Sequence, residues 1–425
     1  MKGFYNRILR IDLSNRTFIE EDLPDSVLIT TLGGKGLGTH LLLKYNPPNI
    51  DPFDAENHMI FTTGPLTGSG IFGSSRYAVF TKSPLTERYG ESYSGGSAVL
   101  GIDKTGYDAI IIKGISKGPV WLNISNGIVD FNDAAKLWGL DTFASEKILA
   151  SQSPPKAKNI VIGPAGENLV RFAVIKNDGW RVAGRVGMGA VLGSKQVKGL
   201  VFHGNMKREY YDRKGLQNFA KTSYQTLKTH NTAIAYRSFG TPMGVEILNS
   251  KGAFPTRYWK KGFFNSWKNI DAIRMQESCD VKPHPCASCF LACGKKSVVK
   301  SGRHQGLLIE GPEYETIYAF GGLCEVDSIP DIAYLNDICD RLGIDTISAG
   351  NLAALSIEAY QQGKSKYPLR YGDVDGIARL LRDISAREAL GDVLADGIRH
   401  AGKTFGMVED TIHVKGLEPA GYDPR

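Results

Sequence analysis

Three closely spaced cysteines are the residues in this chain whose types and spacing most directly indicate chemistry. The segment Pro285–Gly294 contains Cys286, Cys289 and Cys293, with gaps of two and three residues. Such gaps let one tight loop aim several thiolates at a single point, which suits an iron-sulfur cluster or a zinc site that takes a further ligand from elsewhere. The spacing favours iron-sulfur over zinc, and loop cysteines that bind nothing are the simpler alternative.

The other cysteines do not extend this group. Cys279, Cys324 and Cys339 are scattered, and Met1–Arg7 lacks the apolar core of a secretory signal. A disulfide framework is therefore a poor interpretation of the six cysteines. Cys339 lies on an apolar helical stripe and is expected in the core, where free cysteines are commonly buried. We expect none of the three to be a metal ligand.

Two acidic segments in the second half of the chain are also candidates for chemistry. Glu310–Glu315 places three carboxylates around a turn. A solvated acidic turn is the simplest interpretation, but a buried carboxylate near a metal would act as a general acid or base. In a later segment, Asp340 and Asp345 bracket Gly343. That glycine suits the position after a helix C-terminus, and the two carboxylates could also hold the amino groups of a heterocycle.

Glycine-rich loops punctuate the first half, where backbone amides and nearby arginines can hold phosphate groups. The loops are Gly33–Gly38, Gly64–Gly68, Tyr93–Gly96 and Gly184–Gly189, with Arg76, Arg181 and Arg185 interleaved. None has the spacing of a P-loop, and Gly187–Gly193 misses the dinucleotide fingerprint by one residue. Together they favour a phosphate-bearing cofactor, while ordinary turns between strands are the alternative for any one of them.

Composition limits the class of protein. A chain of 425 residues exceeds what one core usually serves, so two or more domains are expected. The net charge of +7 is small for this length and comes from interspersed lysines and arginines, which does not indicate nucleic-acid binding. The longest apolar runs, such as Ala109–Ile112, have the length of strands and cannot span a membrane. With no targeting signal in view, we expect a cytoplasmic protein.

The elements that must position these residues change type along the chain. Ile8–Leu13 with Thr17–Glu21, and Val120–Ser125 with Ile128–Phe131, predict hairpins. Further strands are expected at His58–Thr63, Tyr77–Thr81, Ala109–Lys113, Asn159–Ile162, Val170–Ile175 and Gly199–His203.

From about Tyr210 onward the apolar residues recur at helical spacing. The clearest stripes are Ile332, Leu335, Ile338, Cys339 and Leu342, and then Ile377, Leu380, Leu381 and Ile384. The sequence therefore predicts an α+β protein. A β-rich domain over 1–208 precedes a mainly helical domain over 209–425, with the boundary near Gly204–Arg208.

Many ordered stretches resemble the tungsten-containing aldehyde ferredoxin oxidoreductase family. They are Gly64–Gly68, Arg76–Tyr77, Thr81–Thr86, Ser94–Gly96, Gly106–Ile110, Ile162–Val170, Asn177–Gly179, Gly189–Val191, Gly193–Lys195, the cysteine segment, Glu310–Glu315 and Leu342–Ser348. Each is weak alone, but their common order along the chain makes the resemblance specific.

The resemblance implies that the β-rich domain is a base for two molybdopterin molecules that chelate one tungsten, or molybdenum, atom. A [4Fe-4S] cluster held by the cysteine segment would lie beside them. In this family a magnesium ion, Mg²⁺, joins the two pterin phosphates through main-chain carbonyls that correspond to Tyr93 and Ala183. Tyr93 replaces the usual asparagine, a change that a backbone ligand tolerates. The neighbouring residues implied to contact the cofactor are Ser94, Gly95, Gly96, Gly184 and Arg185.

Other roles are carried over residue by residue. Arg76 matches the arginine between cluster and pterin, where a planar fork of donors can contact both. Asp340, Gly343 and Asp345 match the first of the family's two pterin-binding motifs.

The implied reaction is oxidation of a small aldehyde to a carboxylic acid, with water supplying the oxygen. Electrons would leave singly through the cluster to ferredoxin or another one-electron carrier. Glu315 is the expected carboxylate beside the metal, with Tyr314 adjacent.

The sequence also departs from the family. Tyr334 and Asp337 occupy the positions of its E-x-x-H pair, so a metal bridging two subunits is not expected. Leu417–Arg425 resembles an interior stretch, after which the family has an active-site histidine, its second pterin motif and the fourth cluster cysteine. We therefore expect the third family domain to be absent from this chain, which would be a fragment or would work with a separate C-terminal polypeptide.

Three alternatives remain open from the sequence. Related enzymes of this architecture reduce the ring of benzoyl-coenzyme A. A non-catalytic scaffold carrying only an iron-sulfur cluster is the second alternative, and a nicotinamide-dependent dehydrogenase with structural zinc is the third. Metal content would separate the last two from a tungsten enzyme.

Overall fold

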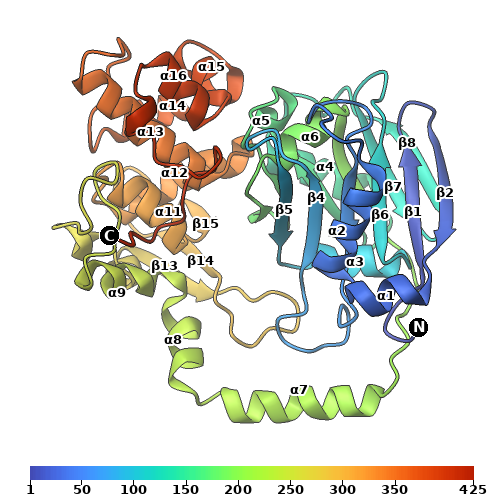
Figure 1. Ribbon diagram of the computed structural model, residues 1–425. Coiled ribbons are helices and arrows are strands. Elements are labelled where there is room, and N and C mark those ends of the chain that lie inside the picture. The colour runs from blue at the N-terminus through green and yellow to red at the C-terminus, as the bar shows by residue number, and fades with distance from the viewer. The chain divides into compact units, whose positions relative to one another are not determined.

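The computed structural model describes all 425 residues and divides into two compact units (Figure 1). The first comprises Met1–Gln225 with Cys286–Cys289, and the second comprises Thr226–Pro285 with Phe290–Arg425. Two large sheets form in the first unit and most of the helices in the second, so the expected α+β class is confirmed. The sequence-based boundary after residue 208 precedes α7 (Arg213–Leu227) and stays a prediction.

One six-stranded sheet of the first unit has the order β2-β1-β6-β3-β4-β5. Its strands are β1 (Arg7–Asp12), β2 (Thr17–Asp22), β3 (Met59–Thr62), β4 (Tyr77–Lys82), β5 (Tyr89–Ser94) and β6 (Ala109–Lys113). Only the pair β1 and β6 is parallel. Helices α1 (Asp25–Thr31) and α2 (Gly34–Tyr45) bury leucines such as Leu28 and Leu41 against Ile60 and Phe80 of this sheet. These apolar side chains form one core of the unit.

A second six-stranded sheet has the order β11-β10-β9-β12-β7-β8. Its strands are β7 (Val120–Ser125), β8 (Ile128–Asp133), β9 (Lys158–Ile162), β10 (Ile175–Asn177), β11 (Arg181–Ala183) and β12 (Val197–Phe202). Besides most of α7, the unit also contains α3 (Ala98–Lys104), α4 (Thr142–Gln152), α5 (Pro164–Glu167) and α6 (Met188–Ser194). Leu149 of α4 packs with Val161 and Val201 of this sheet. Both predicted hairpins are confirmed, as β1–β2 and β7–β8.

Two of the four glycine segments expected as loops contain the start of a helix. Helix α2 starts at Gly34, inside Gly33–Gly38, and α6 starts at Met188. The glycines serve close packing there: a Cβ on Gly38 would lie 2.1 Å from the Phe80 ring, and one on Gly193 would lie 1.9 Å from a backbone oxygen. Close packing therefore requires the lack of a side chain at Gly38 and Gly193.

The strand expected at Val170–Ile175 is mostly wrong. Strand β10 begins at Ile175, and the preceding residues form turns, in which Val170 N–H donates to Ala165 and Ala173 N–H donates to Val170. Val170 and Ala173 are nevertheless fully buried. An apolar run shows burial, but periodicity alone does not distinguish a buried strand from a buried turn.

The second unit is mainly helical, as expected, but it also contains an unpredicted antiparallel sheet. The sheet consists of β13 (Cys279–Pro283), β14 (Lys295–Val299) and β15 (Leu308–Glu310). The helices are α8 (Asn231–Phe239), α9 (Gly244–Ser250), α10 (Ala272–Ser278), α11 (Tyr314–Thr316), α12 (Ile329–Leu342), α13 (Thr346–Gln361), α14 (Val374–Ala386), α15 (Leu390–Ala395) and α16 (Ile398–Thr404). Short 3-10 turns occur at Thr241–Met243, Trp267–Asn269 and Val408–Asp410, and a π-helical stretch occurs at Ile317–Gly322.

Both predicted helical stripes are buried except at Leu342, which is partly exposed. Ile332 and Leu335 of α12 and Leu380 and Leu381 of α14 are fully buried, and the two helices are in contact. Gly343 follows α12 at φ +76° and closes its C-terminus, as the sequence indicated. No helix of the chain is both long enough and apolar enough to cross a membrane.

Candidate active site

Two of the four predicted phosphate loops, Tyr93–Gly96 and Gly184–Gly189, come together where the two sheets of the first unit meet. Strand β5 is an edge of the first sheet, β11 is an edge of the second, and the two are in contact. The Arg185 N–H, two residues after β11, donates to the Ser92 hydroxyl at 3.3 Å. The segments containing Tyr93 and Ala183 are thereby brought to one place, as a shared cofactor contact would require.

A buried polar network lies under the Ser94–Gly96 turn. The Ser94 and Tyr77 hydroxyls donate to Asn177 Oδ1 at 2.7 and 3.0 Å, and Asn177 Nδ2 donates to the Gly95 carbonyl at 3.1 Å. Burial raises the pKa of Tyr77, which keeps this hydroxyl a donor. Every link is internal to the first unit, so the turn is held in one shape before any ligand binds.

The same turn is fixed at its far end by a carboxylate. Asp178 accepts hydrogen bonds from the Ser97 N–H and the Ser97 hydroxyl at 2.5 and 2.6 Å. Gly96 has φ +90°, and a Cβ there would lie 2.3 Å from Asp178 Oδ2. Only glycine fits at this position. Sequence reasoning did not assign Asn177 and Asp178 to the site, although the segment Asn177–Gly179 was among the family-like stretches.

The Ser94–Gly96 turn also positions Cys286, the first cysteine of the predicted metal site. The Gly96 N–H donates to Cys286 Sγ at 3.3 Å, and the Ser75 hydroxyl donates to the Ala287 carbonyl at 2.5 Å. A Cβ on Gly95 would lie 2.8 Å from the same sulfur. A backbone N–H aimed at a thiolate fits a cluster ligand, because hydrogen bonds to cysteine sulfur stabilise its negative charge.

Gly95→Ala is expected to displace Cys286 and to lower the iron content of the anaerobically purified protein. The φ angle of Gly95 is not positive, so a Cβ at this position causes no backbone strain. Its one contact below 3 Å is with the Cys286 sulfur. Gly118→Ala is the matched control, since a Cβ there meets nothing within 4 Å and its φ is likewise not positive. The iron content per folded protein is measured for both variants. Equal iron content in the Gly95→Ala variant and the parent would contradict the proposed dependence of Cys286 on its close packing against Gly95.

Arg76 follows Ser75 directly and is exposed. Its position beside the residue that anchors Ala287 places it next to the cysteine segment within the first unit. The role of contacting both cluster and pterin stays a prediction.

The six cysteines differ in exposure, and the expected burial of Cys339 is confirmed. Cys286, Cys289 and Cys293 are partly exposed, whereas Cys279, Cys324 and Cys339 are buried. Cys286 and Cys289 belong to the first unit and Cys293 to the second. No group of three or more His, Cys, Asp or Glu side chains is arranged to hold a metal. The assignment of the three ligands stays a prediction.

Lys295 shapes the chain next to Cys293, and sequence reasoning missed it. This lysine is 2% exposed, and its ammonium donates to the carbonyls of Ala292, Cys293 and Tyr236 at 2.7, 3.1 and 3.0 Å. Burial lowers its pKa, while Cys293 and Glu313 oppose the shift. The buried ammonium orders the backbone that carries the third cysteine of the segment.

In the second unit, Glu315 and Tyr314 share a hydrogen-bonded group with the end of the chain. The Gly421 N–H donates to Glu315 Oε2 at 3.0 Å, and the Tyr314 hydroxyl donates to the carbonyl of the same Gly421. The Tyr314 and Tyr422 rings lie 5.6 Å apart. Burial and the nearby Glu315 charge raise the pKa of both tyrosines, so the phenols remain protonated. Tyr422 is an addition that sequence reasoning did not make.

Asp340 and Asp345 flank the turn at Gly343, and both are buried. Asp340 accepts from Asn336 Nδ2 at 2.8 Å, and Asp345 caps α13 through the Ile347 N–H at 3.1 Å. Ser348 donates to Asp345 at 3.1 Å and to Glu418 at 2.7 Å. Both aspartates therefore have structural partners, and their carboxylates remain suitable acceptors for the amino groups of a pterin.

The residues at the E-x-x-H position have other partners. The Tyr334 ring stacks on His304 at 4.4 Å, and its hydroxyl accepts from Arg382 at 3.0 Å. Asp337 accepts from Arg341 Nε at 2.7 Å, one helical turn along α12.

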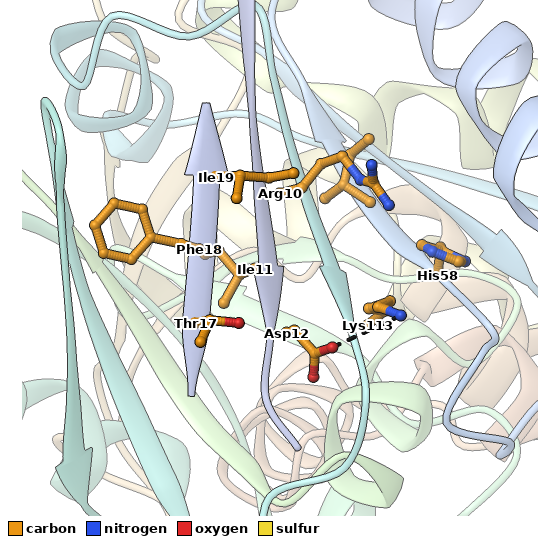
Figure 2. Close-up of a pocket in the computed structure, with 9 residues that line it drawn as sticks. Arg10, Ile11, Asp12, Thr17, Phe18, Ile19, His58 and Lys113 are labelled. Carbon is orange, nitrogen blue, oxygen red and sulfur yellow. Dashed lines mark ion pairs between the residues drawn. The ribbon is translucent and has the colours of Figure 1, made fainter. Parts of the chain in front are cut away.

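The pocket in Figure 2 does not suit the aldehyde oxidation expected from the sequence. It has a volume of about 150 Å³ and lies on β1, β2 and β6, at the opposite end of the first sheet from β5. Its charges are paired: Lys113 Nζ lies 3.6 Å from Asp12, and Arg10 donates to Glu21. Burial lowers the pKa of His58 to about 4, which leaves a neutral ring at neutral pH. We assign no catalytic role to this pocket.

Comparison with known proteins identifies relatives over the whole chain. The family model described as aldehyde ferredoxin oxidoreductase, N-terminal domain, matches residues 8–204, and the model described as domains 2 and 3 of the same family matches residues 218–425.

Named relatives agree with these models. Proteins named tungsten-containing aldehyde ferredoxin oxidoreductase from Pyrococcus horikoshii and Pyrococcus furiosus are 36% and 33% identical over the full chain, which spans 71% of each. A protein of Pyrococcus furiosus named aliphatic sulfonate oxidoreductase, WOR-like subunit, is 29% identical, and the chain spans 72% of it.

A solved structure has the same fold. It is the active site complex BamBC of benzoyl coenzyme A reductase with 1,5-dienoyl-CoA, which matches 99% of this chain at a TM-score of 0.86 and 24% identity. The chain spans 66% of that protein. At this identity the likeness supports the fold alone.

Proposed function

Because the chain belongs to the aldehyde ferredoxin oxidoreductase family, we propose that it oxidises an aldehyde to a carboxylic acid with a tungsten bis-molybdopterin cofactor. In the proposed reaction, one aldehyde and one water give one carboxylic acid, two protons and two electrons. A [4Fe-4S] cluster held by Cys286, Cys289 and Cys293 would supply one-electron transfer to ferredoxin or a similar carrier. The observation that supports the proposal most is the hydrogen bond from the Gly96 N–H to the Cys286 sulfur, on the turn that follows β5, the strand in contact with β11.

The proposed cofactor contacts use groups that the structure offers. Gly96 N–H and the thiols of Cys286, Cys289 and Cys293 would hold the cluster. The backbone at Tyr93 and Ala183 would hold Mg²⁺ between the pterin phosphates. Asp340 and Asp345 would accept hydrogen bonds from pterin amino groups, because ionised carboxylates are acceptors only.

When bound, the tungsten centre supplies two-electron chemistry, and the chain supplies proton transfer and position. Glu315 would take a proton from water or hold the aldehyde oxygen. The Gly421 N–H donates to one of its oxygens at 3.0 Å, and the Tyr314 hydroxyl donates to the carbonyl of the same residue. One carboxylate oxygen is thus oriented by the backbone.

Metal content and turnover test the proposal together. Cells are grown with tungstate, and the chain is produced together with a candidate C-terminal polypeptide and purified anaerobically. We expect this protein to contain tungsten and iron and to reduce a viologen dye in the presence of an aldehyde. Iron without tungsten would instead support an electron-transfer scaffold, and zinc alone would support a dehydrogenase. Benzoyl-CoA-dependent turnover without aldehyde turnover would overturn the proposed substrate class and favour ring reduction.

Cys289→Ala is expected to remove most of the iron, since a cluster that loses one of its few protein ligands becomes labile. Cys339→Ala is the matched control, because this buried cysteine lies in the core of α12. Iron per folded protein and the visible absorbance of the cluster are the measurements. Unchanged iron in Cys289→Ala would exclude this residue as a ligand.

A further inference from the structure

We propose that Lys295 raises the reduction potential of the proposed [4Fe-4S] cluster through its buried positive charge. The inference rests on the cluster of the proposed function, and not on tungsten or on the aldehyde. Lys295 begins β14, two residues after Cys293, and both residues belong to the second unit. Its role is to place a charge beside a ligand, which makes it a positioning residue and not a catalytic one.

The contacts of the Lys295 side chain show that it is protonated. Its Nζ donates to the Ala292 carbonyl at 2.7 Å, to the Tyr236 carbonyl at 3.0 Å and to the Cys293 carbonyl at 3.1 Å. An ammonium group has three N–H donors, one for each of these oxygens, whereas a neutral amine lacks the third. Carbonyl oxygens orient the ammonium but carry no net charge, so they leave its positive charge in place.

This positive charge is buried and no ion pair cancels it. The Lys295 side chain is 2% exposed, and its fourth and longest contact, at 3.5 Å, is again a carbonyl, that of Gly294. Glu313 and Glu310 attract the ammonium only from a longer range. Water and dissolved ions screen a buried charge less than a surface charge, so it acts more strongly on its surroundings.

The charge acts most strongly on Cys293. Burial lowers the pKa of Lys295, and the negative charge of Cys293 is the strongest of those that oppose this shift. Because an electrostatic interaction is mutual, the ammonium stabilises negative charge on the Cys293 sulfur. A cluster gains one negative charge when it is reduced, and net charge is one of the factors that set its potential. A fixed positive charge at this place therefore favours the reduced state.

Helix α8 holds the ammonium beside Cys293. The Tyr236 carbonyl, near the end of α8, accepts from Lys295 and also from the Gly240 N–H at 2.9 Å. Gly240 has φ +67°, and a Cβ there would lie 2.7 Å from the Cys293 carbonyl oxygen and 3.3 Å from Lys295 Cγ. A helix C-terminus carries partial negative charge, which favours a cation next to it. The position of the charge is therefore fixed before a cluster binds.

Redox titration followed by electron paramagnetic resonance tests the inference, because it measures the cluster without turnover. The protein is produced with the candidate C-terminal polypeptide and purified anaerobically. Lys295→Gln removes the charge and keeps hydrogen-bond donors. We expect it to lower the ratio of reduced to oxidised cluster by about tenfold at a fixed solution potential, which is a shift of about 59 mV for a one-electron couple. Lys295→Arg keeps the charge and should keep the midpoint potential of the parent.

Lys282→Gln is the matched control. It removes the same charge from an exposed position on β13 of the same sheet, where Lys282 pairs with Asp280 at 3.2 Å. Its midpoint potential should equal that of the parent. Equal potentials in the parent and Lys295→Gln would overturn the inference. Equal shifts in Lys295→Gln and Lys295→Arg would overturn it as well, since the shape of the loop and not the charge would then set the potential.

A second neutral variant, Lys295→Met, covers the case in which glutamine disturbs the loop. Iron per folded protein is measured for every variant, and a neutral variant that keeps its iron should show the lower potential. Loss of iron from both neutral variants would overturn the inference, because Lys295 would then be needed to hold the cluster and not to set its potential. A parent protein without any cluster would contradict the proposed function itself, which keeps the two failures apart.

Discussion

Glu315→Gln is expected to lower kcat for aldehyde oxidation by about 10²–10⁴-fold, the usual contribution of a positioned general acid or base. Glutamine keeps the size of the side chain and an oxygen that can accept from the Gly421 N–H, now 3.0 Å from Glu315 Oε2. It cannot take a proton from water. Initial rates of viologen reduction at saturating aldehyde give kcat, and tungsten and iron contents show whether the cofactors are retained.

The control for this substitution is Glu325→Gln in the same unit. Glu325 forms an ion pair with Arg257 at 3.5 Å and is not hydrogen-bonded to Tyr314 or Tyr422. Removing the Glu325 charge should therefore leave kcat unchanged. Retention of the parent's kcat by Glu315→Gln, with full tungsten and iron, would show that Glu315 is not the proton acceptor. A loss of tungsten instead would show that Glu315 acts in cofactor retention.

Arg208→Met is expected to destabilise the first unit by about 3–5 kcal/mol, the usual cost of leaving a buried charge without its partner. The Arg208 side chain is 1% exposed and donates to Asp103 at 3.0 Å and to Asp108 at 2.9 Å. It also donates to the Thr63 hydroxyl at 2.9 Å and to the Gly3 carbonyl at 2.8 Å. Methionine fills part of the volume but leaves two carboxylates without their cation.

Hydrogen exchange of the β1 and β6 amides measures this effect within the first unit, because core strands report global opening. Arg213→Met is the control, since Arg213 is exposed at the start of α7 and should change stability by about 0.5 kcal/mol or less. An equally small change in Arg208→Met would mean that solvent reaches Asp103 and Asp108 once the arginine is gone.

Elements with strong local patterns could be predicted. The Asn126–Gly127 turn fixed the β7–β8 hairpin, and the apolar stripe of α12 gave its buried face and its end at Gly343. Strand β5 was missed because its buried positions are Gly90, Ser92 and Ser94, which are small or polar and give no apolar alternation. That same feature places small residues at the edge where the candidate site forms.

The sequence by itself determined the types of chemistry present: a cysteine segment with metal-site spacing, an acidic turn, and the order of stretches that marks the family. Only the tertiary structure brought Gly96 to Cys286, 190 residues away, and Gly421 to Glu315, 106 residues away. It likewise showed that glycines at 36, 38 and 193 serve packing. Local periodicity and spacing depend on neighbours along the chain, whereas contacts between distant segments depend on how sheets and helices close on one another, which no local pattern encodes.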